Sequence, residues 1–323
     1  MSGSISVLAT FSDPDLEKTI RSRLSDVEAM LRDSVRSNYP FVDETSRHLL
    51  DAGGKRFRPL VVLLASHFGD PASSAVVPAA VAIELTHLST LYHDDVMDEA
   101  VMRRGAPSAN ARWDNTIAIL TGDFLFARAS EITADLGTDA TRILARTIAV
   151  LCEGQIRETV GPGDADAVEH YLRVIDDKTG SLIATSGRLG AQLAGADAAT
   201  VEALATYGTR IGVAFQLSDD LLDITSGSSE SGKTPGTDLR EGIHTLPTLF
   251  AEQDGFAVPA DLTSNEVLHS TLAELRVHPA LERARAALRQ EADAARACLA
   301  GLPDIPARAA LDALCDMVVA RTS

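Results

Sequence analysis

The chain has 323 residues and a formal net charge of −17, with 45% hydrophobic and 4% aromatic residues. This length provides an ample core for one large domain or two ordinary ones. The acidic balance argues against nucleic-acid binding through a basic face, and an anionic ligand would need clustered cations or bound metal ions. Cys152, Cys298 and Cys315 are odd in number and show no CxxC spacing, which indicates free thiols in a reducing compartment.

The sequence predicts an all-α protein without a transmembrane segment. Its N-terminus lacks the basic-then-apolar pattern of a signal peptide, and no apolar run reaches about 18 residues. Neither strand-like alternation nor a nucleotide-binding glycine pattern is present. We therefore expect a cytoplasmic protein with one domain over residues 1–323, in which residues 1–12 form a flexible arm.

Helical periodicity begins at Asp13, an N-cap followed by Pro14 at the first helical position, and continues to Val35. Glycine, proline and serine mark breaks at 161–163 and 225–237, and another break falls at 253–263. The remaining helices are expected at 42–50, 60–68, 78–99, 116–133, 141–160, 181–194, 201–224, 279–300 and 306–319.

An acidic motif ends the apolar run that starts at Val76. Asp94, Asp95 and Asp98 stand at positions i, i+1 and i+4, so the first and last share a helix face and Asp95 is offset by about 100°. Carboxylates against an apolar stripe repel one another unless a cation neutralises them, and hard oxygen ligands suit Mg²⁺ that also holds a phosphate. The alternative is an acidic helix end exposed to solvent.

The same spacing recurs in Asp219, Asp220 and Asp223, again at the end of an apolar segment. If the two helices face each other, six carboxylates converge on one cavity, which then needs several divalent metals. Metals on an apolar wall suggest a ligand with a diphosphate head and an apolar tail.

Basic residues in several segments accompany the acids. Lys55, Arg56 and Arg58 lie between two glycines and a predicted helix start, where a phosphate is favoured over a merely solvated turn. Arg103 and Arg104 follow the first motif and clamp an anion or balance nearby acids. His87 lies two turns before Asp94, as a ligand contact or a satisfied core group. Lys233 lies in a glycine- and serine-rich stretch that is either a lid over the site or a linker.

These segments in this order resemble the trans-isoprenyl diphosphate synthases, the polyprenyl synthetases. The resemblance rests on GGKRFRP, ELTHLSTLYHDDVMD, RRGAPS, KTG, FQLSDDLLDI and GKTPGTDLREG and covers residues 41–250. It implies a single-domain bundle of helices around a deep central cavity, normally in a homodimer. It also implies Mg²⁺, three ions per active site, and two substrates, isopentenyl diphosphate and an allylic diphosphate.

The resemblance also assigns roles by motif. A Mg²⁺ cluster on the allylic diphosphate would be bound by Asp94, Asp95, Asp98, Asp219 and more weakly Asp223, with Asp220 in support. The same diphosphate would be held by Arg103, Lys178, Gln216 and Lys233, with Thr179 near the reacting carbon. Isopentenyl diphosphate would be bound by Lys55, Arg58, His87 and Arg104. One departure is Ile243, where the family often has a lysine, and His244 is a partial substitute.

The implied reaction loses diphosphate from the allylic substrate, joins the resulting cation to isopentenyl diphosphate and releases a proton. Ser89 and Thr90, the fifth and fourth residues before Asp94, are small, whereas short-chain members often carry aromatics there. We therefore expect a product of around six to ten isoprene units, because small residues leave a passage open for the growing chain. Phe124 and Phe126 are candidate plugs of that passage.

Other functions remain open from the sequence. A short-chain farnesyl or geranylgeranyl diphosphate synthase would use the same chemistry. A terpene cyclase usually lacks the second full acidic motif and the GGKRFRP cations. A non-catalytic accessory subunit loses its acidic motifs, which this chain keeps. A generic divalent-metal-binding protein would not explain the ordered cations.

Overall fold

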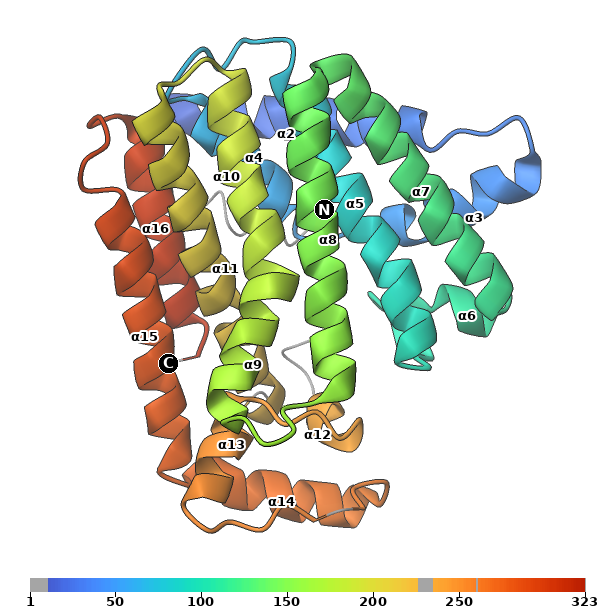
Figure 1. The fold of residues 1–323 in the computed structure, drawn as a ribbon, viewed down its shortest axis with the longest axis vertical. Helices are drawn as coiled ribbons and strands as arrows, with labels where there is room; N and C mark the ends of the chain where they lie inside the picture. The colour runs from blue at the N-terminus through green and yellow to red at the C-terminus, as the bar shows by residue number, and fades with distance from the viewer. Residues whose placement is uncertain (1–10, 226–234, 260, 323) are drawn as a thin grey trace. The chain divides into compact units, whose positions relative to one another are not determined.

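The computed structural model describes residues 11–225, 235–259 and 261–322. Within these residues the regular secondary structure consists of helices, apart from two strands of two residues each (Figure 1). The predicted all-α class is therefore confirmed. None of the described helices is long and apolar enough to span a lipid bilayer. Two compact units can be distinguished, and the single domain around a deep cavity stays a prediction.

The first unit contains the chain up to Ile148 together with Leu182–Gly208 and Cys298–Leu314. It includes the beginnings of three long helices that continue into the second unit: α8 (Thr138–Val160), α11 (Ala198–Thr225) and α16 (Pro306–Ala320). Its other elements are α2 (Pro14–Ser34), α3 (Pro40–Asp51), α4 (Phe57–Ser66), α5 (Val76–Met97), β1 (Met102–Arg103), β2 (Ala106–Pro107), α6 (Ala109–Arg112), α7 (Asn115–Leu136) and α10 (Ser181–Leu193).

Helix α5 is the core of this unit. Its residues from Val76 to Ser89 are buried on almost every side, because the sequence there is apolar all round rather than along one stripe. It packs against α2, α4 and α7. The acidic motif stands at its C-terminal end, so this packing fixes the position of the motif within the unit.

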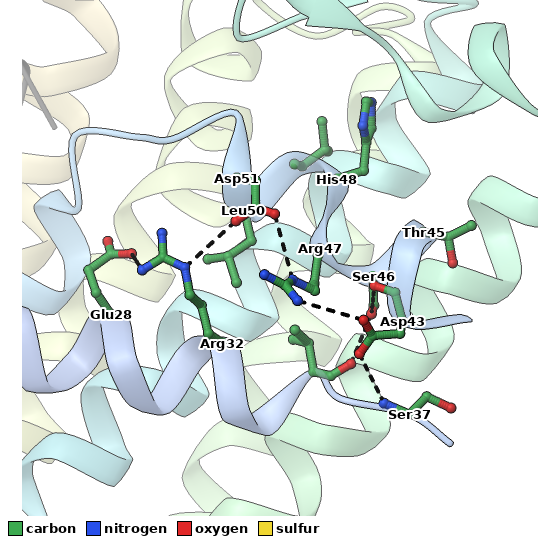
Figure 2. A network of polar contacts seen from close by, with 12 residues as sticks. Glu28, Arg32, Ser37, Asp43, Thr45, Ser46, Arg47, His48, Leu50 and Asp51 are labelled. Carbon is green, nitrogen blue, oxygen red and sulfur yellow. Dashed lines mark hydrogen bonds and ion pairs between the residues drawn. The ribbon is translucent and has the colours of Figure 1, made fainter. Parts of the chain in front are cut away.

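Helices α2 and α3 are joined by a network of ion pairs on the surface (Figure 2). Arg32 lies 3.7 Å from Asp51, and Arg47 lies 3.6 Å from the same carboxylate and 3.7 Å from Asp43. These groups are substantially exposed, so each pair contributes little free energy. Glu28 of the same network also reaches the buried Arg56, which connects the surface pairs to the loop before α4.

Glycines bring α10 and α11 into backbone contact. A Cβ atom on Gly187 would lie 2.3 Å from the carbonyl oxygen of Leu204, and one on Gly208 would lie 2.5 Å from that of Ile183. No side chain fits at such distances, so each helix requires glycine opposite the other.

The second unit contains Ala149–Ser181, Thr209–Ala297 and Cys315–Ser323, of which residues 226–234, 260 and 323 lie outside the described part. The continuations of α8, α11 and α16 belong to it. Its other elements are α9 (Ala167–Ile175), the π-helical turn η1 (Asp176–Gly180), α12 (Thr237–Arg240), α13 (Leu246–Gln253), α14 (Asn265–Val277) and α15 (Ala280–Cys298).

The predicted helices are confirmed with shifts of a few residues at their ends. Asp13 caps α2 as expected, because its carboxylate accepts a hydrogen bond from the Leu16 amide at 2.7 Å. Helices α6, α9, α12, α13 and α14 were not predicted, nor was the β1–β2 hairpin. The start of α9 does carry a local signal, since Asp166 caps the helix and Glu169 follows three residues later. Phe11 is buried, so the packed chain begins within the predicted arm.

We predict that Gly187→Ala lowers the free energy of unfolding by about 1–3 kcal/mol, because the methyl group would force α10 away from the Leu204 carbonyl. Alanine has a higher helical propensity than glycine by about 1 kcal/mol, and this gain offsets only part of the free energy lost to the steric conflict. Urea denaturation of the full chain measures the change.

The matched control is Gly301→Ala, because a Cβ atom at Gly301 meets nothing within 4 Å and its φ is not positive. Its unfolding free energy should stay within about 0.5 kcal/mol of the parent protein. Equal stability of the two variants would contradict the close helix approach.

Candidate active site

The first acidic motif divides into one buried and two more accessible carboxylates. Asp95 is fully buried, and its Oδ1 accepts a hydrogen bond from Arg103 Nε at 2.5 Å. Its Oδ2 is buried and has no hydrogen-bond partner. Asp94 is half-buried and Asp98 exposed, one turn apart on the same helix face. Arg103 Nη2 lies 3.8 Å from Asp98 Oδ2, so one arginine contacts two acids of the motif.

The arginine that binds Asp95 is placed by the β1–β2 hairpin. Arg103 pairs with Ala106, which leaves Arg104 and Gly105 as a two-residue turn with φ values of 54° and 76°. Positive φ at both central residues matches the right-handed twist of the strands, and glycine supplies it without steric cost. The hairpin thus directs two consecutive arginines to different partners.

Arg104 turns to the loop that follows α3. Its Nη1 donates to the carbonyl oxygens of Leu49, at 3.1 Å, and of Gly53. Its guanidinium passes so close to Gly54 that a Cβ atom there would lie 3.1 Å from it. A side chain at the second glycine of the GGKRFRP segment would therefore press on the guanidinium of Arg104, a predicted substrate cation.

Arg56 of the same segment has a structural role that the sequence did not indicate. It adopts a left-handed backbone conformation and its side chain is 4% exposed. It binds Glu28 at 2.5 Å and the buried Glu84 at 2.9 Å. Because buried ions need such partners, this pairing accounts for Arg56 and leaves Lys55 and Arg58 as the predicted anion-binding residues. Lys55 is exposed and Arg58 half-buried.

His87 lies among these cations. Desolvation holds the pKa of its imidazole well below 6.5, and the positive charges of Arg58, Arg104, Arg56 and Arg103 lower it further. Arg58 and Arg104 have the larger effects among these four charges, since Arg56 and Arg103 are paired with carboxylates. The structure thus brings together the predicted isopentenyl diphosphate residues Arg58, His87 and Arg104.

In the second unit, two acids of the motif bind donors from distant segments. Asp219 Oδ1 accepts from Arg321 Nη2 at 2.6 Å, and Arg321 also covers the Phe215 ring. Asp223 accepts from the backbone amides of Thr237 and Asp238, both at 3.2 Å, so it lies at the N-terminus of α12. No sequence signal pointed to Arg321.

Asp220 lies inside this unit at 3% exposure. Its Oδ2 accepts a hydrogen bond from the Tyr171 hydroxyl, and its Oδ1 accepts one from Gln216 Nε2 at 2.8 Å. The Gln216 carbonyl oxygen in turn accepts from Thr179 Oγ1 at 3.1 Å. Burial and the neighbouring carboxylates Asp219 and Asp223 raise the pKa of Asp220 to about 7, although both donors oppose this rise.

Lys178 and Thr179 lie in the π-helical turn rather than at the start of a regular helix. Lys178 Nζ pairs with Glu158. The preceding Asp177 is buried and contacts Arg157 at 3.4 Å and Arg173 at 3.2 Å. A π-turn inserts one residue into a helix and often marks a functional position.

The predicted chain-length residues lie near the contact between α5 and α7. Ser89 is 2% exposed and donates to the carbonyl oxygen of Gly122 at 2.8 Å, so it packs against α7. Thr90 is half-buried and donates to the His87 carbonyl of its own helix. Phe124 lies under the Arg128 guanidinium, 5.3 Å from ring centre to Cζ. Two residues on, Phe126 points about 200° away from Phe124, so the two rings do not line one passage.

Lys233 and His244 have no described contact with the other predicted site residues. Lys233 lies outside the described residues. His244 Nδ1 lies 2.9 Å from Glu252 Oε1, so this histidine has an acidic partner of its own beside Ile243.

The carboxylates fit a divalent metal in their chemistry. All the candidate ligands are oxygen donors, and the buried Asp95 Oδ2 lacks a hydrogen-bond partner. Asp94 and Asp98 share one face at the end of α5, as ligands from one helix must. Among the described side chains, no group of three or more His, Cys, Asp or Glu is already arranged around a metal position.

Comparison with known proteins identifies the family. The polyprenyl synthetase family model matches residues 39–273. The chain belongs to the polyprenyl synthetase family. The predicted resemblance, the isoprenoid synthase fold and the prenyltransferase class are thereby confirmed.

Individual members of the family are similar over nearly the whole chain. A nonaprenyl diphosphate synthase of Mycobacterium tuberculosis is 47% identical, over 94% of this chain and 93% of its own. A geranylgeranyl pyrophosphate synthase of Corynebacterium glutamicum, solved with calcium and isoprenyl diphosphate, is 44% identical with a TM-score of 0.87 over 97% and 99% of the two chains. A decaprenyl diphosphate synthase of Rhodobacter capsulatus is 36% identical with the same TM-score over 96% and 99%.

We predict that His87 makes the protein less stable as pH falls. Its folded pKa lies below its unfolded value, so the unfolded chain binds a proton that the folded one excludes below about pH 6.5. The free energy of unfolding should therefore fall by up to about 1.4 kcal/mol per pH unit from this group. In His87→Gln this contribution should disappear.

Urea denaturation of the two proteins at pH 7.5 and at pH 5.0 measures the difference in slope. The buffer must contain no phosphate, because an anion held by the surrounding guanidinium groups would favour the protonated ring. The same loss of stability in both proteins would show that His87 titrates normally in the folded state.

Proposed function

We propose that this prenyltransferase condenses isopentenyl diphosphate with an allylic diphosphate to make a medium- or long-chain polyprenyl diphosphate. The observation that carries the proposal is the positive cluster around His87 in a polyprenyl synthetase that keeps two complete acidic motifs. Two anionic substrates need two separate sets of positive charge, and the sequence supplies both.

The diphosphate of isopentenyl diphosphate is assigned to Lys55, Arg58, His87 and Arg104. Arg104 and Arg58 are guanidinium groups, which bind phosphate oxygens in a fixed geometry. Gly54 lets the backbone approach Arg104, Gly53 supplies a φ of 92°, and the Arg56 pair with Glu84 holds the loop in place. A neutral His87 offers this anion one hydrogen-bond donor, and it gains a proton readily once the negative charge has bound.

The allylic diphosphate is assigned to the acidic motifs together with Arg103, Lys178, Gln216 and Lys233. Three Mg²⁺ ions per active site would be held by Asp94, Asp95, Asp98, Asp219 and Asp223. Bound metal there supplies positive charge that stabilises the departing diphosphate. Arg103 and Arg321 pair with Asp95 and Asp219 of the two motifs, and Lys178 pairs with Glu158, so each of these cations lies beside an acid.

The reaction proceeds by exchange of one bond for another. The allylic C1–O bond breaks and its electron pair leaves with the diphosphate. The alkene of isopentenyl diphosphate donates its π electrons to C1, which forms the new C–C bond. A proton is then lost to the released diphosphate, which restores a double bond. No side chain forms a covalent intermediate, so the protein contributes position, charge and exclusion of water.

A medium or long product, around six to ten isoprene units, is supported by relatives named for nonaprenyl and decaprenyl diphosphate. A short product is the alternative, favoured by the similarity to a geranylgeranyl pyrophosphate synthase. The small residues at 89 and 90 favour the longer product, and Phe124 and Phe126 stay candidate plugs that would limit it. A homodimer is part of the proposal, and exposed Ile119 and Leu120 on α7 support an apolar contact with a second copy.

The function is tested by incubating the purified full-length protein with Mg²⁺, isopentenyl diphosphate and each of several allylic diphosphates. We expect a series of prenyl diphosphates that ends between about six and ten isoprene units, as the small residues predict, and no product in the presence of EDTA. Mass spectrometry of the products gives their length. A terminal product of three or four units would favour the short-chain alternative, and no elongation with any primer would refute the reaction itself.

We predict that Ser89→Phe shortens the product by at least one isoprene unit. Residue 89 is buried on α5, so a phenyl ring there would extend into the proposed passage below the acidic motif and block the growing chain. Ser89→Ala removes the hydrogen bond to Gly122 without adding volume, so its product should match the parent. Both variants must show a folded thermal transition before products are compared. An unchanged length in a folded Ser89→Phe protein would exclude residue 89 from the passage.

A further inference from the structure

Four polar side chains in the second unit form one continuous hydrogen-bonded chain. It runs from Tyr171 of α9 through Asp220 and Gln216, which lie one turn apart on α11, to Thr179 in the π-helical turn. Tyr171 and Asp220 are buried, whereas Gln216 and Thr179 are half-buried. The chain therefore leads from the interior of the unit to a residue predicted to lie beside the reacting carbon.

The chemistry of the four groups fixes the direction of the hydrogen bonds. Asp220 Oδ1 accepts both when the group is ionised and when Oδ2 carries a proton, so the face of Gln216 toward Asp220 must carry the amide NH₂ group. The amide oxygen of Gln216 then faces Thr179, and an amide oxygen also only accepts. Thr179 must therefore donate its hydroxyl hydrogen to Gln216. Both lone pairs of the hydroxyl oxygen remain for a neighbour on the other side.

An isolated glutamine would not define this direction, because its amide group can be turned by 180° at little cost. With the amide reversed, Thr179 would accept from Gln216 and point its own hydrogen at the substrate. Asp220 prevents this reversal, and Tyr171 fixes Asp220 by binding its other oxygen. Linked hydrogen bonds also polarise one another, so the accepting Asp220 polarises the Gln216 amide, and this in turn adds to the electron density on the Thr179 oxygen.

We propose that Tyr171 is a positioning residue for prenyl transfer: through Asp220 and Gln216 it commits the Thr179 hydrogen away from the substrate and presents the hydroxyl oxygen to the allylic carbon. This inference rests on the proposed function, in which positive charge develops on that carbon as diphosphate leaves. An oxygen lone pair stabilises such charge, and a hydroxyl hydrogen in its place repels it. Tyr171 itself does not touch the substrate.

Tyr171→Phe removes one hydroxyl from this chain and preserves the ring. We expect a fall in kcat on the order of tenfold, because Asp220 is no longer fixed and the Thr179 orientation is lost in the transition state. The KM values for both diphosphates should stay within about twofold, because the hydroxyl makes no substrate contact. Measurements use the full-length protein at saturating Mg²⁺.

A double-mutant cycle separates positioning from a general structural role. Thr179→Val removes the hydroxyl on which Tyr171 is proposed to act, whereas Thr179→Ser preserves it. If Tyr171 acts through Thr179, the double variant Tyr171→Phe, Thr179→Val should be no slower than Thr179→Val alone. With Thr179→Ser in place of valine, the loss caused by Tyr171→Phe should return. Fold-losses that multiply in the double variant would overturn the proposal.

Tyr207→Phe is the matched control, because Tyr207 is fully buried and donates one hydrogen bond, to the Leu311 carbonyl at 2.8 Å in the first unit. Its kcat should equal that of the parent, and an equal loss in both tyrosine variants would overturn the proposal. If Tyr171→Phe does not fold, Asp220→Asn provides the second test, since an NH₂ group then stands where one of the two Asp220 oxygens accepted from Tyr171 or Gln216. It should lose kcat to a similar extent, again without further loss from Thr179→Val.

The parent protein in the same assay tests the reaction itself. If the parent makes no product with any allylic diphosphate, the proposed function fails and this inference fails with it. If the parent is active and Tyr171→Phe retains its kcat, the inference alone is wrong.

Discussion

Buried negative charge is the constraint on which the rest of this structure depends. A carboxylate removed from water is tolerated only beside a cation or several hydrogen-bond donors. Asp95 therefore takes Arg103, Glu84 takes Arg56, and Asp220 takes a tyrosine and a glutamine. Arg56 and Tyr171 lie 28 and 49 residues from the acids they bind, whereas Arg103 and Gln216 lie only 8 and 4 residues away. The acidic motifs thus determine where the connecting segments must lie, as well as where the chemistry takes place.

Helix geometry explains why the acids of one motif differ. In each motif the second acid stands about 100° around the helix from the first, and it is the buried one: Asp95 in the first unit and Asp220 in the second. The outer acids stay closer to solvent. The same spacing that places two carboxylates on one face therefore sends the third into the core, where it organises neighbouring side chains. Asp95 and Asp220 differ in their partners, since one binds an arginine and the other neutral donors.

Much of this could be predicted from the sequence, because apolar periodicity defines the long helices and helical spacing places the acids. The features that could not be predicted depend on contacts between distant residues or on the backbone conformation of a single residue. The sequence does not show that Arg56, between two predicted substrate cations, turns inward, because this follows from its left-handed backbone. Tyr171 lies 49 residues before Asp220, and Arg321 lies 102 residues after Asp219, so no local pattern reveals either contact. Ser89 stays a predicted border of the passage, and the sequence did not show that its hydroxyl donates to a backbone carbonyl of α7.

The β1–β2 hairpin has a consequence for how this enzyme can vary. Its two-residue turn directs Arg103 to the acidic motif and Arg104 to the loop that contains Gly53. A longer turn would change the positions of both arginines. One inserted residue would shift the register and exchange the sides to which the guanidinium groups point. Substitutions here would alter one charge at a time, but an insertion would displace both guanidinium groups from their partners together. The length of this turn is therefore expected to be far less free to drift in evolution than the identity of most residues around it.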